Sequence, residues 1–211
     1  MGKAVYVIGI KIDRDKSQGT LGKSQEAYIN KILERYRINN CSSGVAPIVK
    51  GNKLSLEQGP KNNLEREEMK NILYASAVGS LMYAQVCTRP DIAYAMGMLV
   101  RYQSNPDLDY WKAAKKVMRY LQRLKDSKLM YGLSNHLEVI GYLDSDFASC
   151  LDSKKSTLRY VFILPGGDIS WRSGKQSLIS TSITEAEFVA CFEESSQAIW
   201  SRSFILGLKN C

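Results

Sequence analysis

Three short apolar runs followed by a long helical pattern, all in the last third of the chain, constrain its fold more than any other feature. VIGYLDSDFA, KKSTLRYVFIL and DISW, between residues 139 and 171, are rich in β-branched and aromatic residues and are typical of strands. Pro165-Gly166-Gly167-Asp168 separates the last two runs and indicates a hairpin turn. A helix is predicted from about Thr184 to Gly207. We expect this helix to cover the sheet with four large apolar residues, Phe188, Phe192, Ile199 and Leu206.

Two acidic residues in this block stand where a fold could bring them together. Asp144 lies on the first predicted strand, and Glu187 lies in the first turn of the predicted helix. Asp146 follows two residues after Asp144 and shares its face of the strand, so it could lie beside the same site. The alternatives are structural. Asp144 would be a solvent-facing acid of an edge strand, and Glu187 would cap the helix, because TSITEAE has the capping-box spacing for both Glu185 and Glu187.

The chain resembles copia-type long-terminal-repeat retrotransposon polyproteins in the order and content of these motifs. Their ribonuclease H domain runs roughly as GY-x-D-[AS]-D-W-A, a basic pair before ST-SGY-x-F, ISW, and SSTEAEY. Here the counterparts are GYLDSDFA, KKSTLRYVF, ISWRSGKQ and TSITEAEF. Upstream, YVIGIKI resembles the family's last palm strand, SQEAYINKIL the helix after it, VGSLMYAQVCTRPDIAYA the thumb and connection region, and DYWKAAKKVMRYLQ the helix before the ribonuclease H domain. The resemblance covers nearly all 211 residues.

The resemblance implies an α+β or α/β fold, with a helical thumb–connection region before a partial ribonuclease H-like fold, a mixed sheet with a packed helix. The implied domains are the end of the reverse transcriptase palm and thumb (1–38), a linker (39–63), the helical thumb and connection region (64–134), and a truncated ribonuclease H-like domain (135–211). The implied ancestral activity is Mg²⁺-dependent hydrolysis of RNA in an RNA–DNA hybrid. Asp144 and Glu187 would be the catalytic metal ligands and Asp146 a weaker one, since Mg²⁺ prefers carboxylate oxygens.

Several positions depart from the family's pattern. The paired aspartates of the polymerase are absent, and the third and fourth metal-binding acids of the family have no counterpart before Cys211. Leu158 and Arg159 stand where Ser-Gly is usual, and Phe147 stands where Trp is usual. Whether the chain is an enzyme therefore stays open, and we expect a Pol polyprotein fragment that is inactive as it stands.

Positive charge is concentrated upstream of this block. Of the 29 Lys and Arg and the 21 Asp and Glu, residues 135–211 hold 7 and 9, so residues 1–134 hold 22 and 12, a net charge of +10. A helix predicted from about Leu108 to Leu124 has one buried stripe, made of Trp111, Ala114, Met118 and Leu121. Its other positions supply six basic residues, Lys112, Lys115, Lys116, Arg119, Arg123 and Lys125. A phosphate backbone would relieve their repulsion, so the second hypothesis is a non-catalytic nucleic-acid-binding module; the alternative is a solvated helix face.

The remaining pattern is mostly helical. The first fifteen residues predict a strand, and a helix is predicted over about 26–36 with Ser24 as its N-cap. A helical pattern over 64–101 is interrupted near Pro90.

Composition excludes several other classes of protein. Five cysteines without a C-x-x-C pair favour reduced thiols over a disulfide framework. The single histidine, His136, lies in a predicted turn and gives little support for a zinc site or a histidine-dependent hydrolase. No apolar run is long enough for a transmembrane helix and no signal sequence is evident. We expect an intracellular protein, cytoplasmic or nuclear, whose partners are an RNA–DNA hybrid or other nucleic acid and the remainder of a Pol polyprotein. A relic without a biochemical role is a third possibility.

Overall fold

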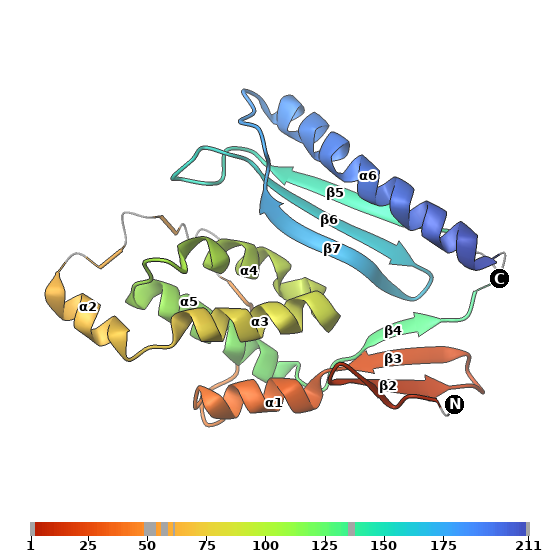
Figure 1. Ribbon diagram of the computed structural model, residues 1–211, viewed down its shortest axis with the longest axis horizontal. Helices are drawn as coiled ribbons and strands as arrows, with labels where there is room; N and C mark the ends of the chain where they lie inside the picture. Colours follow the sequence, from red (N-terminus) through yellow and green to blue (C-terminus); the bar gives the residue numbers. More distant parts are fainter. Residues whose placement is uncertain (1–2, 49–53, 56–58, 61, 135–137, 210–211) are drawn as a thin grey trace. The chain divides into compact units, whose positions relative to one another are not determined.

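The structure of the chain is a computed structural model that describes residues 3–48, 54–55, 59–60, 62–134 and 138–209 (Figure 1). The chain divides into two compact units, one of residues 1–12 and 23–128 and the other of residues 13–22 and 129–211. The predicted turn at His136 lies outside the described residues.

The amino-terminal segment is a hairpin, which corrects the prediction of a single strand. β1 (Tyr6–Val7) and β2 (Ile10–Asp15) pair antiparallel, with Val7 opposite Ile10. Between them Ile8 and Gly9 have φ angles of 50° and 73°, the left-handed pair that a two-residue type I′ turn requires. The alternating pattern identified extended backbone correctly, but it could not show the reversal because isoleucine rarely adopts positive φ.

β3 (Thr20–Ser24) and β4 (Leu129–Gly132) follow in a sheet whose strand order is β1-β2-β3-β4. The predicted helical region 64–134 therefore ends in a strand, which corrects that part of the prediction. The Tyr131 hydroxyl of β4 donates a hydrogen bond to the Asp168 carbonyl at 2.7 Å, and burial raises the pKa of this phenol to about 12. This hydrogen bond connects β4 to Asp168, which belongs to a separate sheet of the second unit.

The helices of the first unit lie close to where the periodicity predicts them. Their bounds are α1 (Glu26–Arg35), α2 (Asn63–Lys70), α3 (Tyr74–Thr88), α4 (Ala93–Leu99) and α5 (Leu108–Arg123), with 3₁₀ turns η2 (Pro90–Ile92) and η3 (Val100–Tyr102). The predicted interruption at Pro90 is confirmed, and residues 71–73 add another between α2 and α3. Gln25, not Ser24, is the N-cap of α1, although Ser24 Oγ accepts a hydrogen bond from the Glu26 amide at 3.3 Å.

The core of the first unit lies among α1, α3, α4 and α5. The stripe predicted on α5 is confirmed, because Ala114, Met118 and Leu121 are fully buried and Trp111 packs against the core from a partly exposed position. The buried residues of α1, Ile29, Ile32 and Leu33, belong to the same cluster.

The described parts of the predicted linker 39–63 are anchored to this core. The Leu54 carbonyl accepts a hydrogen bond from the Tyr102 hydroxyl at 2.8 Å, and the Ser55 carbonyl accepts one from the Tyr110 hydroxyl. The two tyrosine rings are stacked, with centroids 4.6 Å apart. Both hydroxyls are buried, so these bonds satisfy polar atoms that would otherwise carry a desolvation cost.

A nearly buried arginine joins the end of α3 to the end of α5. The Arg89 guanidinium forms a two-point pair with Asp91, from Nε at 3.0 Å and from Nη2 at 2.6 Å. Its Nη1 donates to the Leu124 carbonyl at 3.1 Å, and the guanidinium lies 5.7 Å from the centre of the Tyr120 ring. Burial acts to raise the pKa of Asp91, but the hydrogen bonds and charge of Arg89 outweigh it, so that pKa lies below its usual range.

The second unit contains an antiparallel sheet and one long helix. β5 (Ile140–Asp146), β6 (Thr157–Leu164) and β7 (Gly167–Lys175) pair in the order β5-β6-β7, and α6 (Ile183–Lys209) lies along one face (Figure 1). Three strands, a helix and the hairpin turn are confirmed, with Gly166 at φ 93°. The strand pairs in the described sheet are all antiparallel, which corrects the predicted mixed sheet.

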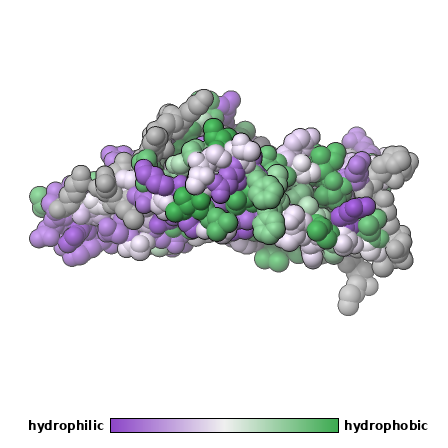
Figure 2. Space-filling view, turned by 90° about the horizontal axis from the view of Figure 1, so that it is seen from above, coloured by the Kyte–Doolittle hydropathy of each residue, from purple (hydrophilic) through white to green (hydrophobic). Residues whose placement is uncertain are grey.

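The face that α6 turns to the sheet differs from the predicted one. Phe188, Phe192, Ile199 and Leu206 are exposed by 70%, 72%, 67% and 48%, so the prediction that they are buried is wrong. The buried positions of the helix are Ala186, Val189, Ala190, Glu194, Ser201 and Ile205. Three of these six side chains, Ala186, Ala190 and Ser201, are small, and none is an aromatic ring. Small side chains let the helix backbone approach the sheet closely, whereas large rings would hold it away. Viewed from above, the molecular surface shows hydrophobic residues (green) interspersed with hydrophilic ones (Figure 2).

Two exclusions made from the sequence can be compared with the described residues. No helix there is both long and apolar enough to cross a membrane. Cys41, Cys87, Cys150 and Cys191 are free thiols, as the prediction of reduced cysteines requires.

Candidate functional site

The first predicted ligand, Asp144, is held in an ion pair across the sheet. Asp144 on β5 stands directly opposite Arg159 on β6, and Arg159 Nη2 lies 2.6 Å from Asp144 Oδ2. Both side chains retain solvent contact, with exposures of 59% for Asp144 and 38% for Arg159. Opposite charges on directly paired residues of an antiparallel sheet are close enough to interact without bending either strand.

Asp144 points away from the helix. Gly141 and Leu143 of β5 line a groove together with residues of α6, so the odd-numbered positions of this strand face the helix. Because side chains alternate along a strand, Asp144 and Asp146 lie on the opposite face. Asp146 is partly buried and stands opposite Thr157 on β6.

The second predicted ligand, Glu187, reaches β5 from the first turns of α6. Its Oε1 accepts a hydrogen bond from the Ser145 amide at 3.3 Å. Within the described sheet β5 is an outer strand, so this bond satisfies a backbone donor that the sheet leaves unpaired. Glu187 therefore adjoins the residue that follows Asp144, but the two carboxylates have different partners.

The capping role belongs to Glu185 rather than Glu187. The Glu185 amide donates to Ser182 Oγ at 3.1 Å, and Glu185 Oε2 accepts from the Thr181 amide at 2.6 Å and from its hydroxyl at 2.7 Å. These hydrogen bonds lower the pKa of Glu185. Of the two candidate capping acids in TSITEAE, the structure thus assigns the cap to the first and leaves the second available for contact with β5.

A buried glutamine positions the strand and the helix around this contact. Gln176, after the end of β7, donates from Nε2 to the Ala186 carbonyl at 2.6 Å and to Ser145 Oγ at 3.3 Å, and its Oε1 accepts from Ser180 Oγ at 3.2 Å. The side chain is 1% exposed. It joins β5, the connection after β7 and the start of α6 beside the Glu187–Ser145 contact.

No larger ligand cluster surrounds the acids. Among the residues that the structure describes, no three His, Cys, Asp or Glu side chains converge as a metal ion would require. The arrangement around Asp144 and Glu187 is one of ion pairing and backbone hydrogen bonding.

The predicted nucleic-acid-binding residues on α5 divide into two groups. Lys112, Lys116, Arg119 and Arg123 recur at helical spacing and form one line along the helix, since each residue turns the helix by about 100°. Lys115 is offset from this line, with its ammonium 5.6 Å from the centre of the Trp111 ring, and Lys125 lies beyond the helix end.

Two members of the line have internal partners. Lys112 Nζ lies 2.8 Å from Asp109 Oδ1, and Arg119 donates from Nε to the Ser42 carbonyl at 2.6 Å and from Nη2 to the Ser42 hydroxyl. Arg119 thus holds the segment around residue 42 against α5. The role of the six residues in binding nucleic acid stays a prediction.

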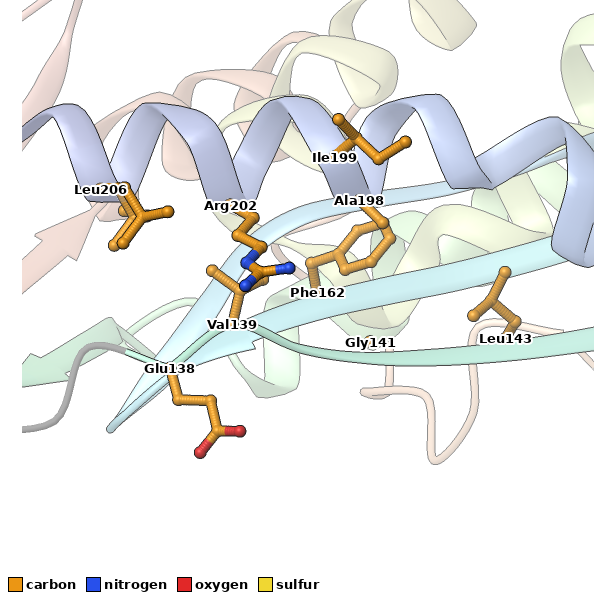
Figure 3. Close-up of a pocket in the computed structure, with 10 residues that line it drawn as sticks. Glu138, Val139, Gly141, Leu143, Phe162, Ala198, Ile199, Arg202 and Leu206 are labelled. Atoms are coloured by element: carbon orange, nitrogen blue, oxygen red, sulfur yellow. The ribbon is translucent and has the colours of Figure 1, made fainter.

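An open groove of about 680 Å³ lies between β5 and the carboxyl-terminal half of α6 (Figure 3). Gly141 and Phe162 form part of its floor, and Arg202 reaches toward Val139 from the helix. A Cβ on Gly141 would lie 2.5 Å from Phe162 Cε1, so only glycine leaves room for the ring. The helical residues of the groove begin at Ala198, roughly 16 Å along the helix from Glu187. The groove is therefore separate from Glu187.

Sequence reasoning recognised Arg159 only as a departure from a pattern and missed its contact with Asp144. The connection between β5 and β6 spans residues 147–156, too long for turn geometry to specify which residues pair. The one sequence feature that points to this contact is an arginine in the strand that follows the acid-bearing strand. That feature does not show which residues of the two strands pair.

Two relatives are Pol polyproteins. The chain is 40% identical over 210 residues to the retrovirus-related Pol polyprotein from transposon TNT 1-94 of Nicotiana tabacum, covering 99% of this chain and 16% of the polyprotein. It is 34% identical over 203 residues to the retrovirus-related Pol polyprotein from transposon RE2 of Arabidopsis thaliana, covering 96% of this chain and 13% of the polyprotein. The chain spans about a sixth or less of the length of these relatives.

A third relative has a different name. The secreted RxLR effector protein 161 of Plasmopara viticola is 43% identical over 132 residues, which are 63% of this chain and 93% of that protein. No family model and no solved structure matches the chain.

Proposed function

Since the chain belongs to the retrovirus-related Pol polyproteins of copia-type transposons, we propose that it combines the end of the reverse transcriptase with a ribonuclease H-derived segment. The ancestral reaction is Mg²⁺-dependent hydrolysis of RNA in RNA–DNA hybrids, and Asp144, Glu187 and the weaker neighbour Asp146 derive from its metal site. In this chain the site does not cleave RNA. The observation that carries this proposal is the 2.6 Å ion pair between Asp144 and Arg159.

The residues as arranged do not fit a Mg²⁺ ion. Mg²⁺ requires near-octahedral oxygen ligands at about 2.0–2.1 Å. Asp144 Oδ2 is in contact with a guanidinium, and Glu187 Oε1 accepts a backbone amide hydrogen. A metal ion at Asp144 Oδ2 would have to displace the guanidinium, and one at the other carboxylate oxygen would lie beside its positive charge, so no catalytic step through a metal follows from this arrangement.

Cleavage of a labelled RNA–DNA hybrid in Mg²⁺ tests the proposal. The purified chain is compared with Asp144→Asn and Glu187→Gln, which remove the carboxylate charges and keep the side-chain shapes. We expect no more cleavage by the unchanged chain than by either variant. Cleavage by the unchanged chain that both variants lose would show an active nuclease and overturn the proposal.

A second function, non-catalytic binding of nucleic acid, is favoured by the line of basic residues on α5. Lys116 and Arg123 extend the line on either side of Arg119, and the three lie on one face of the helix. A phosphate backbone along this face would release counterions, so binding should weaken steeply as salt rises. Arg119 is a poor choice for mutation because its guanidinium also holds Ser42.

The binding function is tested with the double variant Lys116→Glu/Arg123→Glu and a hybrid labelled with a fluorophore. The control is Lys16→Glu/Lys31→Glu, which changes the net charge equally at two exposed lysines outside α5. We expect the α5 variant to lose at least about tenfold in affinity and to show a shallower salt dependence, with little change in the control. Equal losses in both would show that net charge alone governs binding.

A further inference from the structure

We infer that Arg159 acts as a built-in cation for Asp144 and thereby suppresses the binding of divalent metal ions at this carboxylate. The inference rests on the proposed function in one respect, namely that Asp144 derives from a metal ligand. It adds a specific cause for the loss of that role, located in one side chain of this chain.

The backbone places the arginine directly beside the acid. Arg159 lies within β6, the middle strand of the described sheet, paired with Asp144 on one side and Ser173 on the other. Its neighbours Leu158 and Tyr160 are held by the same pairing, so the arginine side chain starts from a fixed point. The ion pair then needs ordering only of the side chains themselves.

The chemistry of the pair favours guanidinium over other cations from the protein. An arginine remains charged at all physiological pH values and presents donors in a planar fork that matches a carboxylate. Glu187 of α6 has a different partner, because its Oε1 accepts a hydrogen bond from the Ser145 amide. Asp146 lies on the same face as Asp144, but it is two residues further along β5 and stands opposite Thr157.

A metal ion at Asp144 would meet two opposing effects. It would first have to compete with an exposed ion pair, which lowers the association constant of the metal ion by up to about fivefold. It would then lie near the displaced guanidinium. The repulsion between a divalent ion and a unit charge roughly 5 Å away in water lowers the affinity of the metal ion by roughly another tenfold. Removing the arginine charge should therefore strengthen metal binding by at least about tenfold.

The test measures uptake of Mn²⁺, with free Mn²⁺ followed by electron paramagnetic resonance, in four proteins. These are the unchanged chain, Asp144→Asn, Arg159→Gln, and the double variant that carries both changes. We expect the unchanged chain and Asp144→Asn to bind Mn²⁺ equally weakly. Arg159→Gln should bind at least about tenfold more tightly, and the double variant should lose that gain.

Two further variants make the result specific. Arg159→Lys keeps a positive charge and should stay close to the unchanged chain. Arg172→Gln removes an arginine from β7 on the face toward α6, as the nearby contact of Ser170 with Gln197 of the helix indicates, and should not gain affinity. Circular dichroism establishes that each variant is folded.

The outcomes separate this inference from the proposed function. Equal Mn²⁺ affinity in Arg159→Gln and the unchanged chain overturns the inference, as does a gain that persists in the double variant or appears equally in Arg172→Gln. Strong Asp144-dependent uptake by the unchanged chain overturns it even if Arg159→Gln does not fold. Hybrid cleavage by the unchanged chain overturns the proposed lack of activity, whereas a metal gain in Arg159→Gln without cleavage supports the inference alone.

Discussion

Replacing Arg89 with methionine should destabilise the first unit far more than replacing an exposed lysine that also forms an ion pair. The Arg89 side chain is 4% exposed, whereas Asp91 is 33% exposed. Methionine fills similar space but removes the cation that pairs with the Asp91 carboxylate and the donor to the Leu124 carbonyl. Breaking a fully buried pair costs about 3–5 kcal/mol. Because Asp91 is partly solvated, we expect a loss of about 2–4 kcal/mol in the free energy of unfolding.

The matched control is Lys112→Met on α5. Lys112 pairs with Asp109 at 2.8 Å, but the two side chains are 66% and 56% exposed. Exposed pairs of this kind contribute little to stability, because water and salt screen the two charges. Both variants replace the basic side chain of an ion pair with methionine, one at a buried position and one at an exposed position.

Urea denaturation followed by circular dichroism gives the free energy of unfolding for both variants. Arg89→Met/Asp91→Asn should recover at least about 1 kcal/mol of the loss, since the neutral amide no longer leaves a charge without its partner. Similar small losses in Arg89→Met and Lys112→Met would refute the reasoning. So would a double variant less stable than Arg89→Met.

Three other predictions concern pH, a glycine and the buried glutamine. The pKa of Asp91 is lower in the folded chain than in the unfolded one. Its contribution to stability is therefore complete above the unfolded value of about 3.9 and disappears as pH falls through the lower folded value. Urea denaturation from pH 6 to pH 3 should show a loss of unfolding free energy that is smaller in Asp91→Asn. Gly141→Ala should cost about 1–3 kcal/mol because Phe162 must move. Gly79→Ala in α3, where nothing lies within 4 Å of the added Cβ, should stabilise the chain by up to about 1 kcal/mol. Thermal unfolding would contradict this reasoning if both variants shifted the melting temperature in the same direction. Gln176→Leu should cost about 2–3 kcal/mol through its lost side-chain hydrogen bonds, and an unchanged melting temperature would disprove that role.

Local signals in the sequence were enough to locate most helices and strands. Pro90 interrupts the helical pattern because it lacks an amide hydrogen, and Gly166 marks the β6–β7 turn because that turn needs positive φ. The buried stripe of α5 follows from the 3.6-residue repeat. The hairpin at Ile8 and Gly9 escaped prediction because its turn uses a residue that rarely adopts positive φ.

The choice of the buried face of α6 required tertiary structure. Phe188 and Phe192 form an apolar stripe by periodicity, and so do the smaller Ala186, Val189 and Ala190 beside them. The pattern cannot rank two apolar stripes on one helix. Close approach to the sheet decides between them, because small side chains shorten the distance between the backbones and large rings lengthen it.

The sequence by itself determined that Asp144 lies on a strand and that Glu187 lies near a helix start, because both facts depend on local patterns. Only the tertiary structure decided what these acids contact. Arg159 faces Asp144 through a register that no short turn specifies, and Glu187 reaches Ser145 because Glu185 takes the cap. Pairing across strands is a non-local property of the folded chain, so the same residues that suggest a metal site in the sequence form an ion pair and a backbone hydrogen bond in the structure.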